Sequence, residues 1–244
     1  DKWQADPPPS SDEKDSKLLL RDVIDSTISI DSIEDDDISI IKSKASMIID
    51  QASTSYPINL TNVLAKLNLE NYLPVFKNIL KNYQETKKKQ NLVDFNDLMV
   101  LLANFLKTKK AEEFLNSIEY IFFDEYQDVN PIQNFILSMF KQKTNIMVVG
   151  DDAQSIYKFR GSDIKYIWNF SDEFKPTETY YLESNYRSTQ EIVNFSQSII
   201  KNNSGQFKKK VVAVNERSGT KPHVLAFRDV NKVDQYRWIA EDIK

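Results

Sequence analysis

The sequence predicts an α/β fold in which helices flank a parallel sheet and a helical segment precedes it. The first observation is that short β-prone runs alternate with segments of helix length. The runs are IEYIFF (118–123), NIMVVG (145–150) and TYYLES (179–184). The second observation is that polar residues follow each run immediately. Strands that alternate with helices form parallel sheets, which bind ligands at the carboxyl ends of their strands, so the three polar strand ends predict one shared site.

The residues before the sheet predict a leader followed by helices. Residues 1–37 are rich in Pro, Ser and acidic side chains, so we expect a loosely ordered leader or insertion there. Apolar residues recur at helical spacing within 38–91, which predicts a helical insertion subdomain. The helix expected over 93–106 has Asp94 as its N-cap, with Asp97 placed to complete a capping box.

Further elements are expected between and after the β-prone runs. They are helices over 130–143, 188–203 and 233–244 and a strand over 221–230. The helix at 188 would begin with Ser188 as its N-cap, and Glu191 would complete a capping box. These elements predict that residues 92–182 form one α/β domain and that residues 183–244 begin a second.

Composition excludes several classes of protein. The 244 residues are 41% hydrophobic and 28% charged, which is enough apolar material for one or two globular domains. The absence of Cys excludes a disulfide scaffold and a thiolate metal site. No apolar run reaches the length of a membrane span, so we expect a soluble, intracellular protein without a membrane partner.

Charge is distributed unevenly along the chain. Residues 1–50 carry 13 Asp/Glu against 6 Lys/Arg, whereas the remaining residues carry 23 against 26. Lysine clusters lie in this mildly basic remainder at 87–89, 107–110 and 208–210. Such clusters either contact phosphates or simply lie on solvent-exposed helix ends and loops. Composition therefore permits a nucleic-acid partner without requiring one.

The end of the first β-prone run carries the residues best suited to chemistry. Asp124 and Glu125 follow this apolar run at once. A carboxylate at a strand end can hold Mg²⁺ through its water shell, and a second can orient or deprotonate an attacking water. The pair therefore suits metal-assisted phosphoryl transfer, and a solvated polar exit from the strand is the alternative.

The end of the second run adds polar and aromatic residues. In VVGDDAQSIYKFRGSD a glycine turn precedes Gln154, which would reach into the site. Tyr157, Phe159 and Arg160 suit stacking on bases and contact with a backbone phosphate. Aromatic residues at this spacing also occur in cores, so the spacing alone does not decide between the two.

An arginine follows the third β-prone run, TYYLES. Arg187 directly precedes Ser188, the expected N-cap of the next helix. The dipole of that helix disfavours a positive charge at its start. An anionic partner such as a γ-phosphate therefore accounts for Arg187 better than a local structural role does.

Three motifs give the chain a resemblance to a known family. FFDEYQDVNPIQ (122–133), VVGDDAQSIYKFRGSD (148–163) and LESNYRST (182–189) resemble motifs II, III and IV of the superfamily 1 DNA helicases of the UvrD/Rep/PcrA type, in the same order. LVDFNDLMVLL (92–102) resembles the helix that precedes motif II in that family. The resemblance implies a RecA-like P-loop NTPase fold whose first domain carries the helical insertion at 38–91.

The resemblance also implies a site for ATP and Mg²⁺. Asp124 would hold Mg²⁺, Glu125 would be the catalytic base for water, and Gln154 would sense the γ-phosphate and couple it to the DNA site. Tyr186 would stack on the adenine base. Arg187 would act as an arginine finger from across the cleft between two RecA-like domains.

The same resemblance implies a path for single-stranded DNA. Tyr157 and Phe159 would contact the strand, and Phe159 stands where the family usually has Trp, so stacking there would be weaker. Arg160 would lie at the DNA or inter-domain surface. The implied function is an ATP-dependent helicase or translocase that moves 3′ to 5′, acts at junctions of single-stranded and duplex DNA, and serves processes such as DNA repair. The oligomeric state stays open.

Two features of the family are missing from the chain. None of the four glycines is followed by Lys, so the phosphate loop G-x-x-x-x-G-K-[ST] is absent, and the last motifs of the family are absent as well. We interpret the chain as incomplete at both ends and expect it to be inactive alone. The alternatives are a non-catalytic nucleic-acid-binding or assembly subunit of the same fold, and the helicase part of a helicase-nuclease.

Overall fold

The computed structural model describes residues 13–30, 35–215, 219–220, 222–223 and 232–243. The chain divides into two compact units, Asp1–Glu178 and Thr179–Lys244. The fold is mixed α/β and rich in helix, and the described residues of each unit include a small parallel sheet. No helix within the described residues is long and apolar enough to cross a membrane.

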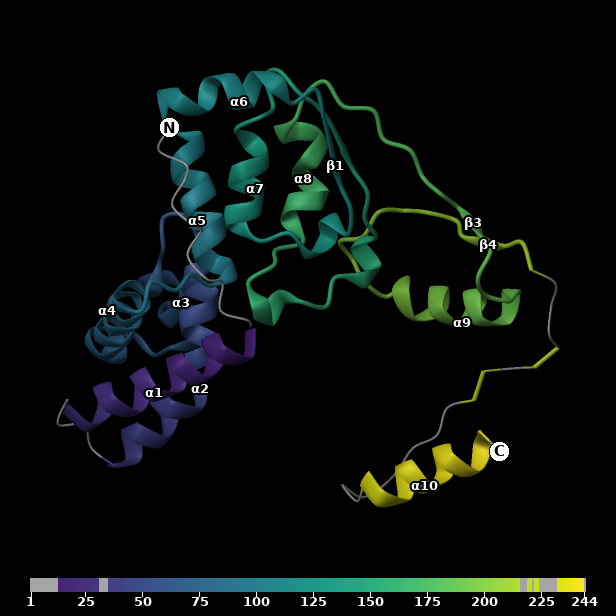
Figure 1. Ribbon diagram of the computed structural model, residues 1–244. Coiled ribbons are helices and arrows are strands. Elements are labelled where there is room, and N and C mark those ends of the chain that lie inside the picture. The colour runs from purple at the N-terminus through teal and green to yellow at the C-terminus, as the bar shows by residue number, and fades with distance from the viewer. Residues whose placement is uncertain (1–12, 31–34, 216–218, 221, 224–231, 244) are drawn as a thin grey trace. The chain divides into compact units, whose positions relative to one another are not determined.

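Four helices at the start of the first unit pack around one apolar core (Figure 1). They are α1 (Glu13–Ile30), α2 (Asp35–Ser53), α3 (Leu60–Leu67) and α4 (Leu73–Lys89), with the 3₁₀ turn η1 (Glu70–Tyr72) before α4. Ile48, Leu64 and Phe76 have no exposed surface in this core. The bundle therefore extends N-terminal to residue 38, where the sequence predicted that helical structure begins.

Part of the expected leader is helical. The buried side chains of α1 are Leu20, Val23, Ile24 and Ile28. Their spacing puts them on one face of the helix, and this face packs into the core in spite of the acidic composition around it. The prediction of a loosely ordered segment over 1–37 is therefore wrong for residues 13–30, and also for residues 35–37, which begin α2. Residues 1–12 and 31–34 lie outside the described part of the chain.

The helix α5 (Phe95–Leu106) begins where the sequence predicted. The Asp97 backbone N–H donates to Oδ1 of Asp94 at 2.8 Å, and the Asp94 N–H donates to Oδ2 of Asp97 at 2.9 Å. This reciprocal pair confirms the capping box. The 3₁₀ turn η2 (Lys109–Ala111) and the helix α6 (Glu112–Ser117) then lead into the sheet.

The strands β1 (Tyr120–Phe123) and β2 (Asn145–Val148) form a parallel pair, in register from Tyr120 opposite Asn145 to Phe123 opposite Val148. The parallel pairing confirms the prediction from alternating strands and helices. Ile121, Phe123, Ile146 and Val148 pack against a core built around the aromatic rings of Tyr126 and Phe170.

The other face of this two-stranded sheet is open. Phe122 and Met147 point away from the core and are 74% and 55% exposed. Two helices complete this part of the unit: α7 (Pro131–Ser138) follows β1, and α8 (Lys165–Glu173) follows β2 (Figure 1). Asn130 and Gln133 form a capping box at the start of α7, which ends earlier than the predicted helix over 130–143.

The second unit contains the short parallel strands β3 (Ser184–Asn185) and β4 (Val212–Ala213), the helix α9 (Gln190–Ile200) and the helix α10 (Lys232–Asp242). The β-prone run TYYLES forms a strand only from its last residue. The strand expected over 221–230 falls almost wholly outside the described residues.

The predicted cap of the next helix is wrong. Thr189, not Ser188, is the N-cap of α9, and it makes no side-chain capping bond. The backbone N–H groups of Arg187 and Ser188 instead donate to Oδ1 of Asn185, at 3.0 and 2.8 Å. Oε1 of Glu191 accepts from the backbone of Gly219 at 3.3 Å. The turn set by Asn185 thus moves the helix start one residue beyond the predicted position.

Candidate functional site

The first exit loop, residues 124–130, leaves the carboxyl end of β1 through a strained turn. The Glu125 backbone N–H donates to Oδ1 of Asp124 at 2.9 Å. Glu125 itself has φ +53° and ψ +41°, the left-handed region that a side chain with Cβ rarely adopts. Such strain concentrates at functional sites. The Tyr126 N–H then bonds the carbonyl of Val149 at 2.9 Å, which ties the loop to the end of β2.

Gln127 is a buried residue of this loop whose role the sequence did not reveal. It is 1% exposed. Its Nε2 donates to Oε2 of Glu125 at 2.7 Å, and its Oε1 accepts from the backbone N–H of Asp151 at 3.0 Å. Gln127 therefore connects the predicted catalytic base to the loop that follows the neighbouring strand. The residue pattern contained no signal for this link, because Asp151 lies 24 residues away in the chain.

The second exit loop, residues 149–164, carries Gln154 at the carboxyl end of β2. The 3₁₀ turn η4 (Asp152–Gln154) is capped by Asp151, whose Oδ1 accepts from the Ala153 N–H at 3.0 Å. Nε2 of Gln154 donates to Oδ2 of Asp151 at 2.9 Å. The parallel pairing thus brings Asp124 and Glu125 to one edge of the sheet with Gln154, as expected for two of the three strand ends. The third strand end follows β3, which pairs with β4 in a separate sheet of the second unit, so the prediction that all three ends belong to one sheet is wrong.

The charge of the first exit loop fits a divalent cation. Burial, and then the negative charge of Glu125, raise the pKa of Asp128 above its ordinary value, against the hydrogen bond from Gln127. Oδ1 of Asp128 is buried without a hydrogen-bond partner. A cation near Asp124 would relieve this concentration of carboxylates.

The carboxylate at this strand end would allow partial ligation of a divalent cation such as Mg²⁺. Within the described residues, no group of three or more His, Cys, Asp or Glu side chains is placed to hold a metal ion by itself. Mg²⁺ is typically bound by one or two carboxylates, with the rest of its octahedron supplied by water and by the phosphates of a substrate. Asp124, an exposed carboxylate at a strand end, suits that partial ligation.

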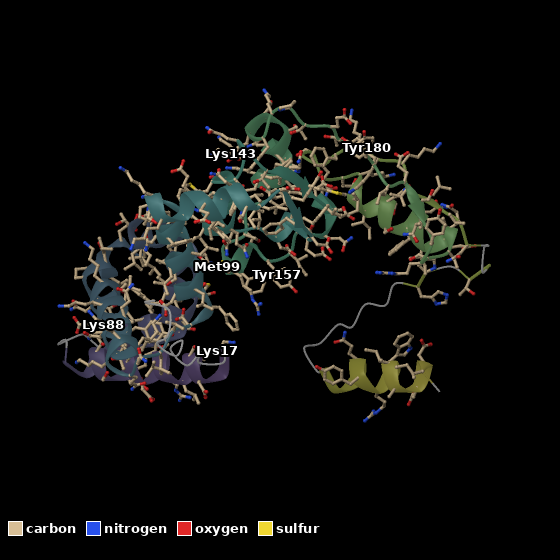
Figure 2. The ribbon with its side chains drawn as sticks, turned by 45° about the horizontal axis from the view of Figure 1, so that its top comes forward. Lys17, Lys88, Met99, Lys143, Tyr157 and Tyr180 are labelled. Carbon is tan, nitrogen blue, oxygen red and sulfur yellow. The ribbon has the colours of Figure 1, made fainter. Side chains whose placement is uncertain are left out.

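The aromatic residues of the second exit loop face solvent. Tyr157 and Phe159 are 39% and 57% exposed, and their ring centroids lie 6.0 Å apart. The guanidinium carbon of Arg160 lies 5.5 and 5.7 Å from those two centroids, within cation–π range. Figure 2 shows Tyr157 at the surface of the first unit. The structure therefore groups these three residues on the surface and not in a core.

The aromatic group is held against α2. Nε2 of Gln51 donates to the carbonyl of Phe159 at 2.7 Å. Gly161 follows with φ +89°, and a Cβ there would lie 2.5 Å from Oγ1 of Thr54. The left-handed turn and the close approach to Thr54, the residue directly after α2, both require glycine at this position.

Tyr186 and Arg187 lie in the second unit, directly after β3. Tyr186 is 73% exposed, and Arg187 is exposed as well. The carbonyl of Tyr186 accepts from Nδ2 of Asn215 at 2.7 Å, and Asn185 bonds the Arg187 N–H as described above. The backbone of this pair is thus fixed within its own unit, and both side chains are available to a ligand.

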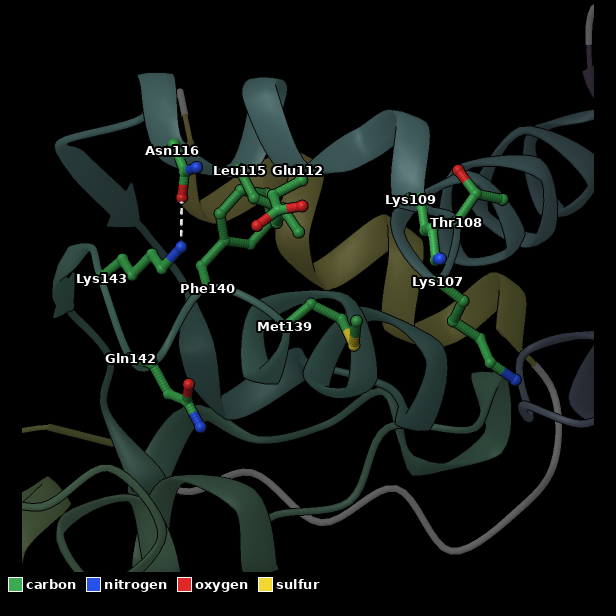
Figure 3. Close-up of a pocket in the computed structure, with 10 residues that line it drawn as sticks. All are labelled: Lys107, Thr108, Lys109, Glu112, Leu115, Asn116, Met139, Phe140, Gln142 and Lys143. Carbon is green, nitrogen blue, oxygen red and sulfur yellow. Dashed lines mark hydrogen bonds between the residues drawn. The ribbon is translucent and has the colours of Figure 1, made fainter.

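A separate pocket lies near the amino ends of β1 and β2 (Figure 3). Its volume is about 310 Å³, and Lys107, Lys109 and Lys143 bring positive charge to an apolar wall that includes Phe140. Nζ of Lys143 donates to Oδ1 of Asn116 at 2.5 Å. None of the predicted site residues lines this pocket.

Comparison with known proteins agrees with the motifs. Residues 8–175 match the UvrD/REP helicase N-terminal domain, and residues 180–244 match the UvrD-like helicase C-terminal domain. The ATP-dependent DNA helicase srs2 of Schizosaccharomyces pombe is 39% identical over 163 residues, which are 66% of this chain and 18% of that protein. The ATP-dependent DNA helicase PcrA of Staphylococcus epidermidis is 33% identical over 168 residues, 68% of this chain and 23% of that protein.

The chain thus spans about a fifth of the length of the curated relatives it matches. The N-terminal domain match alone covers well over half of the chain and contains both exit loops. These sequence matches, with which the geometry at the strand ends agrees, show that the chain belongs to the UvrD/Rep helicase family.

Proposed function

We propose that these residues supply the water-activating side of the ATP site and part of the DNA surface of an ATP-dependent DNA helicase or translocase built on RecA-like domains. The observation that carries the proposal is the pair Asp124 and Glu125 at the exit of β1, joined through Gln127 to the exit of β2. The similarity to proteins named ATP-dependent DNA helicases supports the same function.

In this proposal the carboxylates of Asp124 and Glu125 have different roles. Asp124 would hold Mg²⁺, and that ion would supply charge neutralisation at the ATP phosphates. Glu125 orients the attacking water and takes its proton. Because Gln127 engages Oε2 of Glu125, the other carboxylate oxygen is left to receive that proton. Gln154, held by Asp151 on the next loop, senses the γ-phosphate.

The second unit supplies the other predicted nucleotide contacts. Tyr186 stacks on the adenine base, and Arg187 stabilises charge that develops on the transferred phosphoryl group. The exposure of both side chains and the fixed backbone around them support these roles.

The aromatic group of the second exit loop contacts single-stranded DNA in this proposal. Tyr157 and Phe159 stack on bases, and Arg160 offers a charge to a backbone phosphate. Their exposure and mutual distances support a stacking surface. Movement from 3′ to 5′, action at junctions of single-stranded and duplex DNA, and an intracellular location belong to the same proposal.

The complete protein to which these residues belong provides the test. We expect its ATP hydrolysis to require Mg²⁺ and to be stimulated by single-stranded DNA, and we expect it to unwind a duplex that carries a 3′ tail. ATP hydrolysis without stimulation by DNA, or no hydrolysis, would contradict the proposal.

One alternative is a non-catalytic nucleic-acid-binding or assembly subunit of the same fold. A helicase-nuclease is a further arrangement in which the same site would operate. We expect the 244 residues alone to hydrolyse no appreciable ATP, because they lack the loop that cradles the β-phosphate. Binding of DNA by the complete protein without any ATP turnover would favour the subunit.

A further inference from the structure

Gln127 joins the two exit loops through both ends of one amide. Its donor atom Nε2 bonds Oε2 of Glu125 at 2.7 Å, and its acceptor atom Oε1 bonds the Asp151 N–H at 3.0 Å. In a third contact, the hydroxyl of Ser155 donates to the backbone carbonyl of Gln127 at 3.2 Å. Because the amide is buried, losing either bond would leave an unsatisfied polar group, so the side chain is held strongly in this orientation.

Packing leaves the amide no room to adapt. A Cβ added at Gly150 would lie 2.7 Å from Oε1 of Gln127 and 3.1 Å from its backbone nitrogen. The second exit loop therefore passes directly against the amide, closer than any residue other than glycine permits. A displacement of the loop at Gly150 or Asp151 must move the amide with it.

The far end of the same loop carries the aromatic group. Only a short stretch separates Asp151 from Tyr157 and Phe159, and Ser155 within it bonds the Gln127 carbonyl. At the aromatic group itself, the Gln51 bond to the Phe159 carbonyl anchors the backbone to α2. The short stretch between Ser155 and Tyr157 connects the aromatic group to Gln127, so a displacement of Tyr157 along this stretch reaches the residue that bonds Gln127.

We propose that Gln127 is a positioning residue that transmits the occupancy of Tyr157 and Phe159 by single-stranded DNA to the carboxylate of Glu125. The inference rests on the proposed function, since it takes Glu125 as the base and the aromatic group as a DNA contact. A shift of the Asp151 N–H reorients the Gln127 amide, and the amide in turn rotates the Glu125 carboxylate that it bonds. DNA thereby changes the geometry of proton transfer without touching the nucleotide.

The variant Gln127→Met in the complete protein tests this link, because Met has similar length and forms neither bond. The measured quantity is the ratio of kcat for ATP hydrolysis with single-stranded DNA to kcat without it. We expect this ratio to fall by ~10- to 100-fold, since a misplacement of ~1 Å in a catalytic group can cost ~100-fold. The KM for ATP and the affinity for single-stranded DNA should stay near their unmodified values, because the Gln127 side chain is buried and its hydrogen bonds go to protein groups.

Asn134→Leu is the matched control. Asn134 is also a buried amide, and its partners are the Tyr126 hydroxyl and Glu173, so it bonds neither Glu125 nor the second exit loop. We expect its loss to destabilise the fold while the stimulation ratio stays unchanged. An equal fall of the ratio in Asn134→Leu and Gln127→Met would overturn the proposal, because the effect would then be general destabilisation.

Gly150→Ala tests the same link from the second exit loop, and it replaces Gln127→Met as the test if that variant does not fold. The added methyl group displaces the Gln127 amide and leaves Glu125, Tyr157 and Phe159 intact, so the ratio should fall as in Gln127→Met. An unchanged ratio in whichever of the two variants folds would overturn the inference while leaving the proposed function in place. Absence of DNA stimulation in the unmodified protein would instead overturn the proposed function, and the inference with it.

Discussion

The ammonium group of Lys87 lies 2.6 Å from Oδ2 of Asp94 in a site where both residues are buried. Lys87 is in the last turn of α4, and Asp94 is the N-cap of α5, so the pair joins the helical bundle to the helix that leads to the sheet. Asp97 adds a second bond to Lys87 at 2.7 Å, and the hydroxyl of Tyr83 bonds Asp94 at 3.0 Å. The carboxylates that cap α5 are therefore the same ones that neutralise Lys87.

Replacing Lys87 by Met should destabilise the first unit by ~3–5 kcal/mol, because it leaves the carboxylate of Asp94 buried and unpaired. The control is Lys88→Met, which removes an exposed charge one residue away and should change stability by less than ~0.5 kcal/mol. Urea unfolding followed by circular dichroism measures both. Equal stabilities of the two variants would show that the buried pair contributes nothing.

Acid should weaken the same contact. Burial opposes the charge of Asp94, but the hydrogen bond and charge of Lys87, with the Asp97 N–H and the Tyr83 hydroxyl, outweigh it and hold the pKa of Asp94 below its ordinary value. A depressed pKa in the folded state contributes stability that is complete above the unfolded pKa of ~3.9 and is lost as the pH falls through the folded pKa.

The variant Asp94→Asn checks this sign, since Asn keeps the N-cap and removes the charge. Urea unfolding at a series of pH values should show a smaller loss of stability on acidification below about pH 4 for Asp94→Asn than for the unmodified chain. Parallel curves for the two proteins would mean that Asp94 does not contribute to the acid response.

Phe159→Ala should weaken the binding of single-stranded DNA by ~1–3 kcal/mol, the contribution of one base–aromatic stack. Phe159→Trp should strengthen it, because the larger ring covers more of a base. Tyr120→Ala is the control: this ring is 62% exposed on the open face of the sheet, outside the second exit loop. Fluorescence anisotropy of a labelled oligonucleotide measures the affinities, and equal affinity in all four proteins would remove Phe159 from the DNA surface.

Arg187→Ala should lower kcat for ATP hydrolysis in the complete protein by ~10³-fold or more, since arginine fingers contribute at least that much. Arg237→Ala removes an exposed arginine from α10 of the same unit and should leave kcat unchanged. Steady-state phosphate release measures both variants. A similar kcat for the two would exclude Arg187 from the transition state.

Local patterns predicted the parts of this fold that depend on neighbours in sequence. The capping box of Asp94 and Asp97 follows from their spacing alone, and the parallel pairing of β1 with β2 follows from the intervening helix. Composition does not predict helix α1, because the segment is acidic as a whole although Leu20 and Val23 have helical apolar spacing. Composition is an average over the whole segment, whereas packing depends only on the side chains along one face of the helix.

The remaining features depend on contacts distant in sequence. Gln127 could not be identified as a link because its partner Asp151 approaches only when β1 and β2 pair. The cap of α9 was misplaced because Asn185 uses its side chain on the Arg187 and Ser188 amides before the helix begins. In both cases a polar side chain could bond several partners, and the three-dimensional arrangement determines which partner it bonds.

Glu125→Gln in the complete protein tests the central claim most directly. The measurement pairs the affinity for ATP with the rate of phosphate release in the presence of Mg²⁺ and single-stranded DNA, and Glu119→Gln, at the other end of β1, is the control. We predict unchanged ATP binding and a fall in turnover of ~10²- to 10⁴-fold for Glu125→Gln, the contribution of a general base, with normal turnover for Glu119→Gln. Near-normal turnover in Glu125→Gln would contradict the assignment of the base and, with it, the proposal that the exit of β1 is the water-activating side of an ATP site.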